Sequence, residues 1–218
     1  MSDRYGAVER AARQAGLSVL GGFYPDADDA LSETCQTVLL LGPHEPGFWA
    51  YVRRQREFDD GLPDPLDRWS VRTVDALAAT FGGEAIYPFR GPPYWPFFDW
   101  AIRTGRAWQS PVGMLVHDHA GLMVSFRGAL ALPDILTLDN VAPSPCTRCP
   151  DQPCRTACPV DALGAQHYDL DACHGFLDTA DGGACMAQGC AARRACPVSQ
   201  NYGRVVEQSA YHMSLFHR

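Results

Sequence analysis

The chain has 218 residues, 46% of them hydrophobic, and a net charge of −7. A chain of this size can bury a core without disulfides, and its negative charge argues against binding nucleic acid, which proteins hold chiefly by neutralising phosphates. All eighteen basic residues are arginines, which excludes a Schiff-base lysine, a pyridoxal phosphate anchor and a P-loop lysine. The N-terminus lacks the apolar region of a signal peptide, and no apolar run reaches the roughly 18 residues of a membrane helix. We therefore expect a cytoplasmic protein that binds neither DNA nor a membrane.

The first stretch of the chain alternates helix and strand signals. An amphipathic helix is predicted at the N-terminus and ends at Gly16, and the apolar TVLLLG (37–42) predicts a short buried strand. GFWAYVRRQREF (47–58) predicts a second helix. A longer helix begins at Pro65, preceded by Asp64 as N-cap, and ends at the Gly82-Gly83 pair.

Further along, EAIYPF (84–89) predicts a strand and YWPFFDWAIRTG (94–105) a short helix with Pro96 in its first turn. The segment 112–132 predicts a hairpin that turns at Ala120-Gly121. Because a hairpin requires an antiparallel pair, we expect an α+β fold rather than a doubly wound parallel sheet.

Cysteine usage divides the chain. Residues 1–145 contain only Cys35, which we interpret as a small buried hydrophobe, whereas residues 146–196 contain eight cysteines. Three prolines interrupt the segment between the two parts, LPDILTLDNVAPSP (132–145). We therefore predict a first domain over 1–140 and a small second domain over 141–218.

The eight cysteines allow three kinds of site: disulfides, structural zinc and iron–sulfur clusters. In a reducing compartment, cysteine groups usually bind metal, which makes disulfides the minor alternative. Two zinc sites would favour paired C-x2-C knuckles, and only one such pair is present, whereas the sequence C-P occurs twice, as in bacterial ferredoxins. We therefore predict two 4Fe–4S clusters, with zinc as the alternative.

The first cysteine run has the form C-x2-C-x4-C-x3-C-P, with a second gap two residues longer than in the bacterial ferredoxin run. In two-cluster ferredoxins the cysteine before the proline binds the other cluster. The same exchange here assigns cluster one to Cys146, Cys149, Cys154 and Cys196. Cluster two takes Cys158, Cys173, Cys185 and Cys190.

Two phrases in the second part carry a resemblance to known proteins: LDACHGFLDT (170–179) and GCAARRACPVSQN (189–201). With the first cysteine run, they resemble the dicluster domain of epoxyqueuosine reductase, a cobalamin-dependent iron–sulfur enzyme, and of reductive dehalogenases. This resemblance covers roughly residues 144–202. It implies a small ferredoxin-like domain with two clusters and supports Cys173 as a ligand.

The first part resembles the cobalamin-processing chaperone of the CblC type, whose domain is related to nitroreductases. The matching stretches are TVLLLGPHEPGFWAYV (37–52), DPLDRWSVRTVDALA (64–78) and LVHDHAGLMVSFRGALALPDI (115–135). The resemblance implies a nitroreductase- or CblC-like domain and places His117 and Arg127 near a corrinoid or its co-substrate. Taken without the family, His117 could bind a metal together with His119, which shares its strand face, or could be a surface residue beside a turn. Arg127 could bind a phosphate or carboxylate, or could form a surface ion pair.

These features predict a redox protein whose clusters pass single electrons to a corrinoid, or to a flavin such as FMN, held by the N-terminal domain. If the protein is an enzyme, we expect a cobalamin-dependent reductase that acts on a small-molecule substrate or a redox partner. The alternative is a non-catalytic, ferredoxin-like carrier or a corrinoid-handling chaperone.

Two other features have open interpretations. PPYWPFFDW (92–100) could cover a flat macrocycle, or could pack at an interface as such aromatic stretches usually do. His174 follows Cys173 and could hydrogen-bond a cluster sulfur, or could be exposed to solvent.

Overall fold

The computed structural model describes residues 4–138 and 143–217. It divides into two compact units, each combining segments from distant parts of the chain. The first unit holds residues 4–44, 50–106 and 125–138, and the second holds residues 45–49, 107–124 and 143–217. The predicted boundary between residues 140 and 141 lies outside the described residues. Among the residues described, no helix has the length and apolar character needed to cross a membrane.

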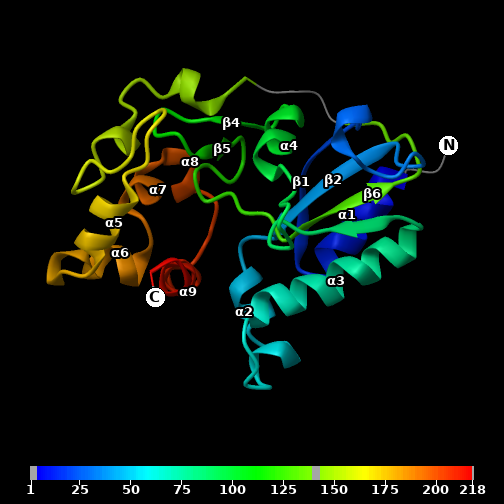
Figure 1. Cartoon of the computed structure of the whole chain (residues 1–218), viewed down its shortest axis with the longest axis horizontal. Coiled ribbons are helices and arrows are strands. Elements are labelled where there is room, and N and C mark those ends of the chain that lie inside the picture. Colours follow the sequence, from blue (N-terminus) through cyan, green and yellow to red (C-terminus); the bar gives the residue numbers. More distant parts are fainter. Residues whose placement is uncertain (1–3, 139–142, 218) are drawn as a thin grey trace. The chain divides into compact units, whose positions relative to one another are not determined.

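The first unit is built on a four-stranded antiparallel sheet with the order β1-β2-β6-β3 (Figure 1). The strands are β1 Leu17–Phe23, β2 Thr37–Pro43, β6 Gly128–Leu132 and β3 Glu84–Ile86. The central strands β2 and β6 are buried at every position, in keeping with their runs of leucine and alanine. Since the named strands of the described residues pair only antiparallel, the α+β class is confirmed.

Helices α1 (Arg4–Gln14), α3 (Pro65–Phe81) and α4 (Phe97–Arg103) pack against this sheet. α1 and α4 contact β1, whereas α3 contacts β6 and also α1. The predicted ends of α3 are confirmed, because Pro65 is its first residue and Gly82 terminates it in the left-handed conformation. Asp64 occupies the N-cap position, but its side chain does not cap the helix. The helix predicted over 47–58 is shorter in the structure, where α2 covers Phe48–Val52 and a 3-10 turn follows at Arg56–Phe58.

The hairpin predicted over 112–132 is wrong. The chain does reverse at Ala120-Gly121, where His117 and Gly121 form an isolated bridge. However, β5 (Leu115–His117) pairs with β4 (Ala107–Gln109), and β6 pairs with β2 and β3. The physical reason lies in β6 itself, which is apolar on both faces and is therefore stabilised at the centre of a sheet rather than in a two-stranded hairpin.

The second unit consists mostly of short helices around the cysteines. They are α5 Leu170–Leu177, α6 Gly183–Gln188, α7 Ala191–Ala195, α8 Pro197–Gln200 and α9 Val206–Phe216. Helices of four to eight residues are not stable by themselves in water, so α5 to α8 depend on tertiary contacts. α9, at the C-terminal end of the chain, packs against α6 and supplies part of those contacts (Figure 1).

Candidate metal centres

Four cysteines line one cavity of about 460 Å³. Cys146 lies in a 3-10 turn (Pro145–Arg148), Cys149 follows that turn, and Cys154 lies in a second 3-10 turn (Pro153–Arg155). Cys196, the fourth, joins α7 to α8 more than forty residues later. We call these four the first quartet.

The proline-rich gap of the first run forms part of the cavity wall. Pro145 and Pro153 each begin a 3-10 turn, as proline favours with its fixed φ and missing N–H. Ser144 Oγ accepts a hydrogen bond from the Cys146 amide at 3.3 Å and so fixes the start of the first turn. Residues 150–153 all line the cavity, so the two extra residues of the gap widen the loop without removing Cys154 from the quartet.

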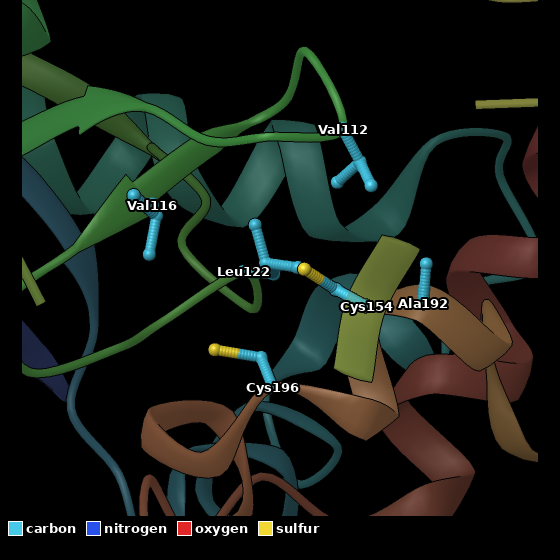
Figure 2. Close-up of a cluster of buried hydrophobic side chains, with 6 residues drawn as sticks. All are labelled: Val112, Val116, Leu122, Cys154, Ala192 and Cys196. Atoms are coloured by element: carbon cyan, nitrogen blue, oxygen red, sulfur yellow. The ribbon is translucent and has the colours of Figure 1, made fainter. Parts of the chain in front are cut away.

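An apolar cover closes part of the first quartet. Figure 2 shows Cys154 and Cys196 with Val116 and Leu122, whose side chains come from β5 and the turn after it. Leu122 is held there by backbone bonds, because its N–H donates to Ser199 Oγ at 2.8 Å and its carbonyl accepts from Arg193 Nη1 at 3.0 Å. Residues 107–124, although far from the cysteines in sequence, therefore belong to the cysteine-bearing unit.

The remaining four cysteines of the 146–196 segment line a second cavity of about 40 Å³. These are Cys158, Cys173 in α5, Cys185 in α6 and Cys190 just before α7. We call them the second quartet. The Ala162 amide donates to Cys158 Sγ at 3.4 Å, so backbone polarity is already directed at one sulfur. Leu163 and Leu177 are among the apolar residues that complete the wall.

The two quartets exchange their proline-linked cysteines. Cys158 precedes Pro159 in the first run yet lines the second cavity, and Cys196 precedes Pro197 in the second run yet lines the first. Helix α7 connects them, with Cys190 before it and Cys196 after it. The five residues of α7 span only ~7.5 Å, so the two cavities are neighbours.

Burial raises the pKa of Cys146, Cys154 and Cys173, and negative charge on the other sulfurs of the same quartet raises it further. For Cys154 those sulfurs are Cys196, Cys146 and Cys149. Four thiolates therefore repel one another in each quartet unless a cation compensates them. Metal binding would supply that compensation and release the protons.

The donor set limits what each quartet could hold. Thiolates are soft ligands that suit zinc and iron–sulfur clusters, and four of them are the usual set for either. In residues 4–138 and 143–217, no three His, Cys, Asp or Glu side chains are arranged to hold a single metal ion. Each quartet lines a cavity, of about 460 Å³ for the first and about 40 Å³ for the second, and supplies the four thiolates that zinc or an iron–sulfur cluster would use.

His117 and Arg127 belong to different compact units. His117 is fully buried in the second unit, where its Nδ1 lies 3.1 and 3.2 Å from the amide nitrogens of His119 and Ala120 and 3.0 Å from Asp118 Oδ1. These contacts hold the turn after β5. In the first unit, Arg127 Nη1 donates to Asp67 Oδ1 at 3.1 Å, which makes an ion pair between the start of β6 and α3.

The aromatic segment 92–100 contributes mainly to the core of the first unit. Trp100 is buried and donates its indole N–H to Asp29 Oδ1 at 2.8 Å, and Phe97 packs against Phe126. Tyr94, by contrast, is exposed. Cys35 is half-buried, with its Sγ 3.7 Å from the Thr37 carbonyl, and its surroundings raise the pKa of its thiol through burial.

Sequence reasoning missed one polar contact to the second quartet. The Tyr168 hydroxyl donates to Cys173 Sγ at 3.6 Å, and burial together with Cys173 raises the pKa of Tyr168. No spacing rule identifies a tyrosine five residues before a cysteine, because the contact depends on the turn that enters α5.

No protein-family model, curated protein or solved structure matches this chain.

Proposed function

We propose that the chain is an iron–sulfur redox protein that carries two 4Fe–4S clusters, one on each quartet. The observation that carries the proposal is the pair of neighbouring cavities, each lined by four cysteines, with the two proline-linked cysteines exchanged. This exchange is the arrangement of two-cluster ferredoxins.

The number and chemistry of the ligands support clusters. A cubane takes one thiolate per iron, so two cubanes use eight cysteines, and the quartets account for eight of the nine in the chain. Cys35 lies in the other compact unit and takes no part. When bound, such clusters accept and release single electrons at potentials set by charge, hydrogen bonds and solvent exposure.

The chain's own residues would govern those potentials. Val116 and Leu122 exclude water from one side of the first quartet. The Ala162 amide points at a sulfur of the second quartet and stabilises negative charge there. Helix α7 keeps the quartets adjacent, which suits passage of an electron from one to the other.

We propose further that the electrons reach a corrinoid, or else a flavin, bound by the N-terminal part of the chain. The resemblance of residues 37–52, 64–78 and 115–135 to cobalamin-processing chaperones supports this step. Titrating the protein with cobalamin while following the cobalt absorption bands tests it. A shift to the base-off bands, followed by dithionite-driven formation of Co(I), supports the reductase, whereas a shift without Co(I) formation favours a corrinoid-handling chaperone. Absence of binding to both cobalamin and FMN would favour the ferredoxin-like carrier.

Metal analysis tests the cluster proposal directly. Protein purified without oxygen should be brown and contain about eight iron and eight sulfide per chain, as two cubanes require. Cys35→Ala is the matched control and should leave both numbers unchanged. About two zinc ions per chain without visible absorbance, the composition of two four-cysteine zinc sites, would overturn the proposal.

A further inference from the structure

Tyr168 is fixed beside the second quartet by the turn that leads into α5. Its backbone forms an isolated bridge with Leu163, and the amide of the next residue, Asp169, donates to the Ala162 carbonyl at 2.8 Å. The Asp169 side chain then caps α5 by accepting from Ala172 at 2.9 Å. Cys173 follows in the first turn of the helix, so the capped turn brings its sulfur to the Tyr168 hydroxyl.

The ring of Tyr168 is also held from the C-terminal helix. Phe216, the last residue of α9, stacks on Tyr168 with 9° between the ring planes and 6.4 Å between the centroids. Phe216 stacks on His174 as well, at 4.7 Å. The phenol is therefore oriented by packing, although Tyr168 is 44% exposed.

His174, the other candidate donor, is engaged elsewhere. Its Nδ1 lies 2.6 Å from Nδ1 of His217, whose Nε2 lies 2.9 Å from Asp178 Oδ1. The Nδ1 of His174 is therefore occupied by its contact with His217. The polar contact from this part of the chain to a quartet sulfur thus comes from Tyr168.

We propose that Tyr168 sets the reduction potential of the second cluster by donating its hydroxyl proton in a hydrogen bond to the Cys173 sulfur. The inference rests on the proposed function. A cluster gains one negative charge when it takes up one electron, so a donor at its thiolate sulfur stabilises the reduced form more than the oxidised form. The hydrogen bond therefore raises the potential, and Tyr168 acts through Cys173 as a positioning residue.

Tyr168→Phe tests this, because it removes the hydroxyl and keeps the ring that stacks on Phe216. We expect the iron content to stay at the wild-type level. At a fixed solution potential, the ratio of reduced to oxidised second cluster should fall about tenfold, which corresponds to a reduction potential lower by ~59 mV for one electron. An EPR-monitored redox titration measures both clusters. The redox couple that is absent in the Cys158→Ala variant is assigned to the second cluster.

Tyr211→Phe is the matched control, since Tyr211 lies on α9, its ring packs at a tilt against Trp49, and it lines neither quartet cavity. It should leave both potentials unchanged. Unchanged potentials in a fully loaded Tyr168→Phe protein would overturn the inference, as would an equal shift of both clusters. Failure of the proposed function is seen separately, because a wild-type protein without cluster iron would show no couple to titrate.

Discussion

Gly121→Ala should specifically weaken the cover of the first quartet. Gly121 ends the turn after β5 with a φ of +57°, in the left-handed region that favours glycine. An added Cβ would lie 2.4 Å from the backbone nitrogen of Ser199 and 2.6 Å from its hydroxyl oxygen. Because Ser199 Oγ accepts the Leu122 amide, displacement of Ser199 would also loosen the apolar cover over Cys196.

The loss of stability expected for Gly121→Ala has two causes. The left-handed conformation costs an alanine about 1–2 kcal/mol. Overpacking against backbone that cannot move freely adds about 1–3 kcal/mol. We therefore expect the free energy of unfolding to fall by about 2–5 kcal/mol, the sum of the two effects.

Gly82→Ala separates the two parts. Gly82 has a φ of +68°, but an added Cβ there meets no atom within 4 Å. It should therefore cost only the conformational part, about 1–2 kcal/mol. The comparison isolates the contact with Ser199.

Denaturant unfolding followed by circular dichroism measures the stability of both variants. The rate at which visible absorbance bleaches in air measures exposure of the clusters, and this rate should rise in Gly121→Ala but not in Gly82→Ala. Equal stability and equal bleaching of the two variants would show that the contact between Gly121 and Ser199 does not hold the cover in place.

The remaining predictions concern the exchanged ligands and one ion pair. Cys196→Ala should abolish the same EPR signal as Cys146→Ala and retain about four irons, whereas Cys158→Ala should abolish the other signal. Loss of the same signal in all three variants would contradict the exchange of ligands. Arg72 lowers the pKa of the buried Glu57 to about 2 through a two-point hydrogen bond. Because the folded pKa lies below the ordinary value, this stabilisation is present above about pH 4.5 and is lost as the pH falls toward 2. Glu57→Gln should therefore flatten the fall of thermal stability over that range, and parallel profiles for the two proteins would refute this.

Local signals in the sequence determined several elements. Pro65 and Gly82 mark the two ends of α3, because each residue restricts the backbone at its own position whatever surrounds it. The apolar run after Thr37 likewise predicted β2, which is buried along its whole length. The cysteine spacing predicted two groups of four, and the two cavities are lined by these groups. That they hold iron–sulfur clusters stays a prediction.

Tertiary structure alone decided which strands pair and which segments enclose the cysteines. The turn at Gly121 was visible in the sequence, but the pairing of β6 with β2 and β3 depends on burying both faces of an apolar strand. The cover formed by Val116 and Leu122 was not visible, because it comes from a segment some thirty residues before the first cysteine of the quartets. Turns and helix ends follow from the conformational limits of single residues. Pairings and contacts between distant segments follow from burial, which only the folded chain as a whole satisfies.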